Sequence, residues 1–348
     1  MVSESDQVLL EWFGATTYRV RWGGLTIFLD TWLERPSVLE KYLPIDDVSE
    51  ADYIFISHAH FDHLPGADRL ALKTGAVIVA NAEAVNHLRA AGVPEEQLIS
   101  VAGGERIPLF SKSDREKAVS GECPTAPGPP GAPPLPHPSL AVMSVHVWPS
   151  LHCLLPGNGP HDLPDVFDTG KVYTGSANPY ACTIDVNRGM RYGMLRMGEL
   201  MPRDKMNDGQ RSFADYVADR KQNVMSACDG GQLAFNLLFG EKKTVLWSAH
   251  LGAYKGILQD LEPKPDVAIL GIAGRGNLNG RPFDGSAAQF AVDELEWLGF
   301  PPTVIWCLHD DSAVKPLRVD TKPATELVEA KTQCKVMDLK PAVTYKLF

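Results

Sequence analysis

The chain has 348 residues, of which 44% are hydrophobic and 22% are charged. These proportions are typical of globular proteins and exclude a fibrous repeat or an intrinsically disordered chain. The 33 basic and 43 acidic residues give a formal net charge of −10, which opposes nonspecific binding to nucleic acid or to an anionic membrane. We therefore expect neither nucleic acid nor a membrane as a partner.

The amino terminus and the cysteines are typical of a cytoplasmic protein. Residues 1–14 carry acidic residues and no basic one, with only a short apolar stretch, which is unlike a secretory signal. No uncharged apolar stretch approaches the roughly 20 residues that a membrane-spanning helix needs. The 6 cysteines are scattered without any C-x-x-C pair, a pattern that favours reduced thiols. We therefore expect a cytoplasmic chain without disulfides.

Residue patterning predicts strands and helices that alternate along the first part of the chain. Runs rich in β-branched and aromatic residues predict antiparallel strands at residues 8–13, 17–22 and 25–29. The pair Gly23 and Gly24 predicts a tight hairpin between the last two. Further along, apolar runs and helical spacing predict strands at residues 53–56, 76–80 and 98–101, and helices at residues 64–73 and 83–91.

The middle of the chain contains two unusual segments. Residues 123–138 hold eight prolines, which neither donate to a sheet nor continue a helix, so this segment predicts a surface loop. A strand is predicted next, at residues 140–148. Residues 157–226 contain methionines and arginines without a simple period and predict an inserted region. We interpret this region either as a lid or as a helical insertion that packs its methionines.

The second half repeats the mixed pattern of the first. Apolar runs and helical spacing predict strands at residues 233–238, 244–247, 267–270 and 303–307, and a helix at residues 287–298. The segment after the proline-rich loop supplies a residue, His152, that the first half needs for its site. We therefore expect residues 1–348 to form a single α/β domain rather than two domains joined by a linker.

The most informative stretch follows the predicted strand at residues 53–56. It contains three histidines and an aspartate within six residues: His58, His60, Asp62 and His63. Imidazole nitrogens and a carboxylate oxygen are typical ligands of zinc, so the stretch supplies most of a metal site. In an extended turn His58 and His60 point to one side, while Asp62 and His63 turn toward a neighbouring site. The stretch could therefore supply ligands to two adjacent metal ions.

This stretch resembles the H-x-H-x-D-H motif of the metallo-β-lactamase superfamily. The opening E-W-F-G-A-T-T-Y-R-V-R-W-G-G-L-T-I-F-L-D also resembles the first hairpin of its ascorbate-6-phosphate lactonase-like branch. The resemblance implies a four-layer αββα sandwich with a metal centre at one edge. In this chain the proline-rich loop and the mid-chain insertion would be additions to that fold.

The resemblance also implies further metal ligands downstream. A third histidine for the first ion would follow the mid-chain strand, where V-H-V-W-P-S-L-H-C supplies His152, with His146 inside the strand as the alternative. The last ligand of the second ion would follow the final core strand, which gives His309. These positions complete the ligand set that the superfamily implies, apart from the carboxylate that bridges both ions.

At the position of that bridging aspartate the chain departs from the superfamily. Ala249 and His250 stand where Gly-Asp is normal. A carboxylate can share two oxygens between two cations, whereas a neutral imidazole offers one lone pair. His250 is therefore expected to bind one ion or none, and both a mononuclear and a dinuclear centre stay open. Asp310 or Asp311 is an alternative source of the missing carboxylate.

These residues predict a metal-dependent hydrolase that binds one or two Zn²⁺ per chain, with Mn²⁺ or iron as alternatives. Zinc lowers the pKa of bound water, so metal-bound hydroxide would attack the carbonyl of a lactone, lactam or ester, or a phosphoester. Asp62 and His250 are the predicted catalytic residues. The alternatives are an iron-dependent oxidoreductase on the same fold and a non-catalytic metal-binding relative.

The expected substrate is a small molecule. A mildly basic segment at residues 183–205 favours an anionic one. Residues expected to contact the substrate lie in loops after the mid-chain strand and after the strand at residues 267–270: His161, Tyr173, Tyr180 and Asn277. The sequence leaves a homo-oligomer open.

Overall fold

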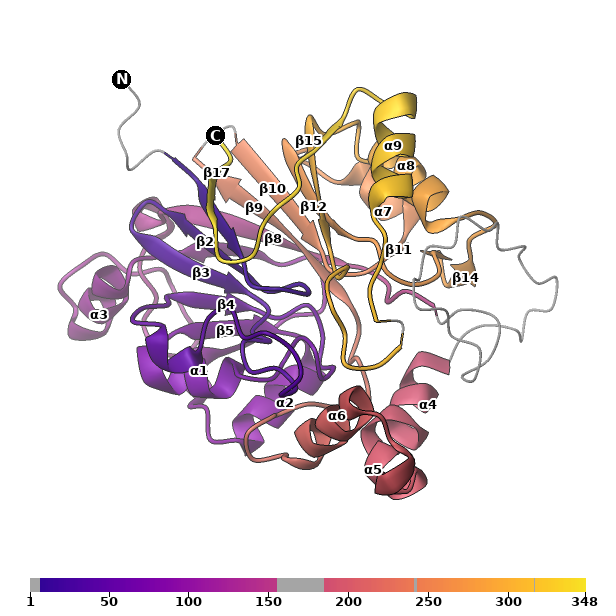
Figure 1. The fold of residues 1–348 in the computed structure, drawn as a ribbon. Coiled ribbons are helices and arrows are strands. Elements are labelled where there is room, and N and C mark those ends of the chain that lie inside the picture. Colours follow the sequence, from indigo (N-terminus) through magenta and orange to yellow (C-terminus); the bar gives the residue numbers. More distant parts are fainter. Residues whose placement is uncertain (1–6, 155–184, 241–242, 316) are drawn as a thin grey trace.

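A computed structural model describes residues 7–154, 185–240, 243–315 and 317–348. Two seven-stranded sheets pack face to face, and helices cover the outer face of each, as Figure 1 shows. The predicted four-layer αββα sandwich is therefore confirmed. Within the described ranges, no helix is long and apolar enough to cross a bilayer.

Sheet 1 is built mainly from the first part of the chain, with one strand from the carboxyl terminus at its edge. Its strands, in spatial order, are β17 (Thr344–Lys346), β1 (Leu9–Trp12), β2 (Tyr18–Trp22), β3 (Leu25–Leu29), β4 (Tyr53–Phe55), β5 (Val77–Ala80) and β6 (Leu98–Ser100). The strands from β17 to β3 pair antiparallel, and those from β3 to β6 pair parallel. Helices α1 (Ala67–Thr74) and α2 (Ala82–Ala90) cover its outer face (Figure 1).

Sheet 2 is built from the second part of the chain. Its strands, in spatial order, are β16 (Lys335–Val336), β15 (Thr303–Cys307), β12 (Val267–Gly271), β10 (Lys243–Ser248), β9 (Leu233–Phe239), β8 (Met143–Pro149) and β7 (Arg106–Leu109). Helices α7 (Lys255–Asp260), α8 (Ala287–Trp297) and α9 (Lys322–Lys331) cover its outer face (Figure 1). A small third sheet contains β11 (Gly252–Ala253), β13 (Asn277–Leu278) and β14 (Arg281–Pro282).

The core lies between the two sheets, because most central strands are apolar on both faces. Phe55 of β4 and Phe235 of β9 meet across the interface with ring centroids 5.2 Å apart. On β10, Val245 and Trp247 face this inner layer, whereas Leu246 packs outward against the helices. Burial on both faces is typical of strands covered by a second sheet and by helices.

The topology brings the ends of separate strands to one edge of the sandwich. Strand β10 runs parallel to β12 and β15, and β8 has the same direction because both pair antiparallel with β9. The carboxyl ends of β8, β10 and β15 therefore lie at one edge of sheet 2. The segments that follow them contain His152, His250 and His309.

Most predicted elements are confirmed, with shifts of a few residues at their ends. The clearest difference is the helix predicted from residue 64, since α1 begins only at Ala67 after Gly66, which has a φ of 96°. Residues 57–66 instead form a tight turn in which Leu64 N donates to His60 O at 3.1 Å. The patterning did not predict β7, β17 or the helix α3 (Lys112–Ser120).

The two unusual mid-chain segments have different structures. In the proline-rich loop a single bridge pairs Thr125 with Pro136. Of the region 157–226, residues 157–184 lie outside the described residues, and the rest contains α4 (Asp185–Tyr192), α5 (Met197–Leu200) and α6 (Asp208–Ala218). These helices pack Met190 and Phe213 against Trp32 and Phe61. The function of this region as a lid stays a prediction.

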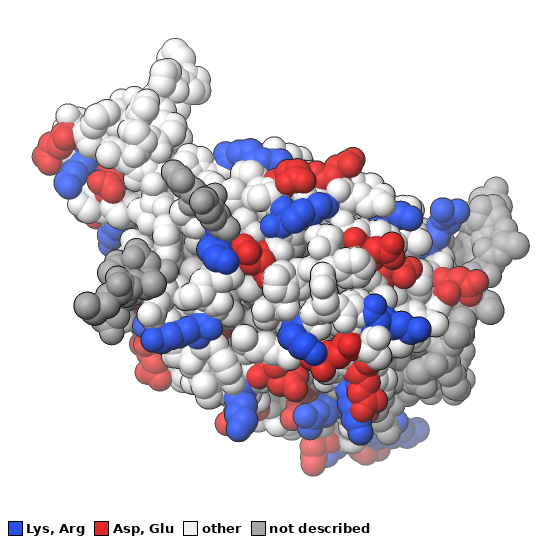
Figure 2. Space-filling model, turned by 90° about the horizontal axis from the view of Figure 1, so that it is seen from above, with Lys and Arg blue, Asp and Glu red and all other residues white. Residues whose placement is uncertain are grey.

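Charged side chains do not gather by sign on the face drawn in Figure 2. Acidic and basic groups alternate over that face instead. Ion pairs among the described residues include Arg19 with Glu11 at 2.7 Å and Lys243 with Asp266 at 3.4 Å. On this face, therefore, no extended basic surface is present for a polyanion.

Candidate metal centre

The turn after β4 is fixed by backbone hydrogen bonds to the segment that leads into β9. Ala59 N donates to Asp229 O at 3.1 Å, and Ser226 N donates to Ala59 O at 2.7 Å. Leu233 N also donates to Ser57 O at 2.9 Å. These bonds hold the turn against sheet 2, so the histidines of the turn face side chains that sheet 2 supplies.

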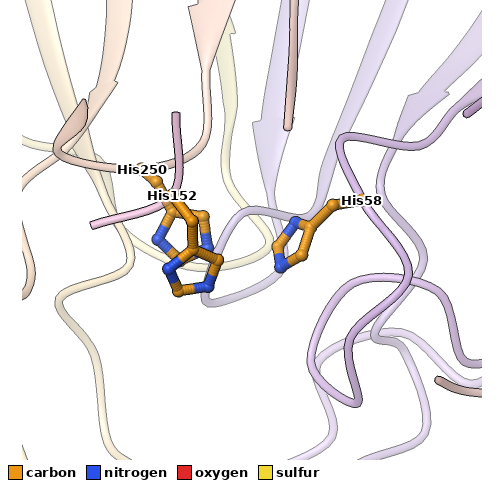
Figure 3. A group of neighbouring side chains, drawn as sticks. All are labelled: His58, His152 and His250. Atoms are coloured by element: carbon orange, nitrogen blue, oxygen red, sulfur yellow. The ribbon is translucent and has the colours of Figure 1, made fainter. Parts of the chain in front are cut away.

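Five histidine rings meet at this edge of the sandwich. The centroid of His58 lies 3.9 Å from that of His63, 4.9 Å from that of His250 and 5.1 Å from that of His152. The rings of His152 and His250 stack at 3.7 Å, and His60 lies 5.1 Å from His152. In Figure 3, His58 faces the pair His152 and His250 across the gap between the two sheets.

Three of these rings are positioned to share one ion. One nitrogen each of His58, His152 and His250 lie within 4.8 Å of one another. Both ring nitrogens of His250 and Nε2 of His60 are buried without a hydrogen-bond partner. Leaving such a group unpaired costs about 1–3 kcal/mol, which metal coordination would offset. The residues present therefore fit a metal ion.

The ring of His152 is already oriented for coordination. A carbonyl oxygen can only accept, so the 2.8 Å contact between His152 Nδ1 and Cys153 O means that Nδ1 carries the proton. Nε2 then keeps its lone pair for a metal. Such a hydrogen bond on the far nitrogen is typical of metal-binding histidines.

Burial and mutual repulsion keep most of these rings neutral. Burial, with the neighbouring imidazoles, lowers the pKa of His58, His60 and His250 well below the ordinary value. Burial also lowers the pKa of His152. A neutral imidazole is the form that binds metal, so these four rings are ready as ligands at neutral pH.

His63 differs from the other four because two carboxylates flank it. Its Nδ1 lies 2.6 Å from Asp30 Oδ2, and its Nε2 lies 3.4 Å from Asp62 Oδ1. Burial opposes the charge on His63, but Asp62 and Asp30 outweigh it and raise the pKa to about 10. Burial likewise opposes ionisation of Asp62, but His63 holds the pKa of that carboxyl below its ordinary value.

Asp30 is a site residue that the sequence reasoning missed. Its carboxylate is fully buried and accepts hydrogen bonds from Ser57 N, Ser57 Oγ and Thr16 Oγ1, at 2.7–2.8 Å. Its φ of 50° lies in the left-handed region, which is uncommon for a residue other than glycine. A single carboxylate that follows a strand carries no spacing signal, so the sequence alone offers little to identify it.

The structure does not bring His309 into the cluster. Its ring centroid lies 4.9 Å from that of Trp12, and it lines a cavity of about 510 Å³ with Trp306, Arg318 and Asp338. Among the described residues, the ring contacts of the five clustered histidines do not include His309. The expectation that His309 completes a second metal site therefore lacks support from this geometry.

The other described residues expected at the site are engaged in contacts outside the five-histidine cluster or support one of its members. Asp310 binds Arg35 at 2.7 Å and accepts from Ala15 N at 2.8 Å, so its carboxylate is occupied. His146 is half-buried on β8 and contacts Glu262 O at 3.4 Å, away from the cluster. Asn277 donates through Nδ2 to His152 O at 2.8 Å, so it supports a candidate ligand. His161, Tyr173 and Tyr180 lie outside the described residues.

Part of the chain is similar in sequence to known proteins. Residues 26–122, which carry the H-x-H-x-D-H turn, match the model of the Beta-lactamase superfamily domain. The likeness to this family model covers residues 26–122 of the 348. A UPF0173 metal-dependent hydrolase from Anaeromyxobacter sp. (strain K) is 38% identical over 87 residues, or 25% of this chain and 31% of that relative. The match to this relative thus spans about a third of its length.

Solved structures of this superfamily fold cover nearly the whole chain. Igni18, a metallo hydrolase from the archaeon Ignicoccus hospitalis, aligns with a TM-score of 0.55 and 17% identity over 98% of this chain and 99% of that one. The diiron β-hydroxylase CmlA from Streptomyces venezuelae aligns with a TM-score of 0.50 and 14% identity over 98% of this chain and 54% of that one. At these identities the likeness concerns the metallo-β-lactamase fold. The lactonase-like branch stays a prediction.

Proposed function

We propose that the chain is a metal-dependent hydrolase that acts on a carbonyl centre of a lactone, lactam or ester, or on a phosphoester, of a small molecule. The observation that carries this proposal is the cluster of five buried or half-buried imidazoles beside Asp62, at the strand ends of a metallo-β-lactamase fold. The matching stretch of a relative named as a metal-dependent hydrolase supports it.

Each group in the cluster has a proposed function. A divalent ion, zinc in the first instance and Mn²⁺ or iron as alternatives, would lower the pKa of water and polarise the oxygen that gains charge. Asp62, whose side chain is 19% exposed, would orient the attacking water through a hydrogen bond to its carboxylate. His63, held between Asp30 and Asp62, would keep that carboxylate in place.

The proposed substrate is small and anionic. Arg188 and Arg191 of α4 both lie close to the ring of Tyr192, at 5.8 and 5.7 Å. The side chain of Asn187 on the same helix accepts from Asp229 N at 3.2 Å, which links α4 to the loop that holds the histidine turn. Both arginines are exposed on α4 and could attract an anionic substrate toward this part of the molecule. His161, Tyr173 and Tyr180 remain proposed substrate contacts.

The first experiment tests hydrolysis directly. The purified chain is assayed with a panel of lactones, lactams, esters and phosphoesters, before and after chelation and after addition of Zn²⁺, Mn²⁺ or Fe²⁺. Because a catalytic metal supplies several kcal/mol of transition-state stabilisation, we expect His58→Ala to lower kcat/KM by roughly 10³-fold. His146→Ala removes a histidine outside the cluster and should keep full activity. Activity that survives both chelation and His58→Ala would overturn the proposal.

An iron-dependent oxidoreductase is the second candidate. The specific observation in its favour is that the diiron β-hydroxylase CmlA shares the fold. All five clustered side chains are imidazoles, which suit iron as well as zinc. Iron in the protein as purified, together with oxygen consumption in the presence of a reductant, would favour this candidate over hydrolysis.

A further inference from the structure

We infer that this chain binds one metal ion, held by His58, His152 and His250, and not the two ions that its sequence motif would serve. The inference rests on the proposed metal dependence, but it does not depend on which reaction the centre catalyses. It assigns His250 as a direct ligand of the first ion, at the position where the superfamily places a bridging carboxylate.

The geometry of the first site supports this assignment. The three rings come from three separate segments, after β4, β8 and β10, yet their ligand atoms lie within 4.8 Å of one another. His250 is 4% exposed, and neither of its ring nitrogens has a hydrogen-bond partner. A buried, neutral imidazole without a hydrogen-bond partner is unfavourable, and coordination of an ion would give it a partner. His60, with Nε2 also unpaired, lies next to this site as a fourth nitrogen donor.

The second site lacks a bridging group. A neutral His250 has one lone pair, and the proton on its other nitrogen blocks a second metal contact. In the remaining candidates, His63 Nε2 lies 3.4 Å from Asp62 Oδ1. His63 is also held at Nδ1 by Asp30 at 2.6 Å. The side chains of Asp62 and His63 thus face each other and Asp30 rather than an open pocket for an ion.

The last ligand of a second site is also missing. Leu308, just before His309, has a φ of 60° and donates its backbone N–H to Ala15 O at 2.9 Å. This backbone conformation accompanies the placement of the His309 ring against Trp12 rather than against His63. Asp310, which could replace it, is bound to Arg35 and to Ala15 N.

Charge balance favours one ion as well. Two divalent ions would bring four positive charges to a site whose carboxylates, Asp62 and Asp30, both lie beside His63. Asp30 already accepts hydrogen bonds from Ser57 and Thr16, and Asp229 Oδ1 accepts from Gly231 N at 3.1 Å. Uncompensated charge in a buried site is costly, so a second ion would bind weakly.

Metal counting tests the inference on the intact chain. The metal-free protein is titrated with Zn²⁺ and with Co²⁺, and bound metal is measured by elemental analysis after gel filtration. We expect saturation at one ion per chain. X-ray absorption of the wild-type zinc protein should show imidazole scattering and no metal–metal distance near 3.5–4 Å, the spacing of two-metal sites. This measurement needs no variant, so it stands even if a substitution prevents folding.

Three variants assign the ligands. Changing an outer partner of a metal site typically costs 10- to 100-fold in metal affinity, so His250→Ala, which removes a direct ligand, should cost at least about tenfold. His309→Ala should leave one ion bound with unchanged affinity. His146→Ala is the matched control, since it removes a histidine of β8 outside the cluster.

The outcomes separate this inference from the proposed hydrolysis. Two ions per chain, with one lost in His309→Ala, would overturn the inference while metal-dependent hydrolysis stands. One ion whose affinity is unchanged in His250→Ala would overturn the assignment of His250. One ion that is lost in His250→Ala, in a protein that hydrolyses none of the panel substrates, would support the inference and count against the proposed function.

Discussion

The two sheets contribute to the centre in different ways. Sheet 1 supplies His58, His60 and His63 from one continuous turn after β4, and all three are fully buried. Sheet 2 supplies His152 and His250 from two separate segments, after β8 and β10. The first contribution is fixed by local backbone geometry. The second depends on which strands become neighbours, and therefore on the whole fold.

The two contributions also differ in their hydrogen bonds. His63 is paired with Asp30, whereas both nitrogens of His250 lack a hydrogen-bond partner, although the two rings lie 5.1 Å apart. Hydrogen bonds within the protein thus hold His63 of the sheet 1 turn, whereas the ring of His250 would gain its partner from a metal ion.

Asp30→Asn should produce the largest loss of stability. The carboxylate of Asp30 is fully buried, accepts hydrogen bonds from Ser57 and Thr16, and pairs with His63. His63 is charged at neutral pH because its pKa is raised to about 10. Removing one partner of a buried ion pair costs about 3–5 kcal/mol. Urea unfolding of the metal-free protein measures the loss. Asp47→Asn, an exposed aspartate, is the control, and equal losses in both variants would contradict this account of sheet 1.

The stability of the fold should depend on pH through Glu294, which lies in the helix layer that covers sheet 2. The side chain of Glu294 on α8 is 2% exposed, and its Oε2 has no hydrogen-bond partner. Burial raises the pKa of this carboxyl well above the ordinary value. The folded chain therefore holds a proton that the unfolded chain releases above about pH 4.5. Stability should fall as pH rises from there toward the folded pKa, by up to about 1.4 kcal/mol per pH unit.

Comparing variants isolates the contribution of Glu294. In Glu294→Gln the decline should be smaller than in the wild type, whereas Glu296→Gln, an exposed change on the same helix, should leave it intact. Denaturant unfolding at several pH values between 4 and 9 provides the test. Parallel pH profiles for the wild type and Glu294→Gln would show that Glu294 is ionised in the folded chain.

His250→Leu should stabilise the metal-free chain. The substitution removes two buried, unpaired nitrogens, each of a kind that costs about 1–3 kcal/mol, while the side-chain volume changes little. Zinc should narrow this difference, since an ion at 100 times its dissociation constant adds about 2.7 kcal/mol to the wild type. Thermal unfolding with and without zinc measures both. A metal-free variant that is less stable than the wild type would mean that His250 has a structural function.

The sequence was informative where the structure is local. The turn with His58, His60, Asp62 and His63 is contiguous, so its residue spacing alone identified a metal site, and the layers followed from the superfamily that it resembles. Strands such as β10 were predictable because they are apolar on both faces. Short edge elements such as β17 were not, since two or three residues carry too little pattern.

The sequence could not predict in which direction a side chain points at the end of a strand. His152 and His309 each follow a core strand, yet only the ring of His152 faces the cluster. The difference depends on contacts far apart in the chain, including the bond from Leu308 N to Ala15 O. The pairing of Asp30 with His63 joins residues 33 positions apart, so no local motif could indicate it.

Asn277→Ala should weaken metal binding slightly, because Asn277 orders the sheet 2 side of the centre. Its Nδ2 donates to His152 O at 2.8 Å and so fixes the segment that carries a ligand. Losing such a supporting bond typically lowers metal affinity by about tenfold. Zinc titration measures the change, with the exposed Asn86→Ala as the control. If Asn277 instead binds substrate directly, the variant would raise KM and leave zinc affinity unchanged. A tenfold loss of affinity would show that sheet 2 needs outside support for its ligand, as sheet 1 needs Asp30.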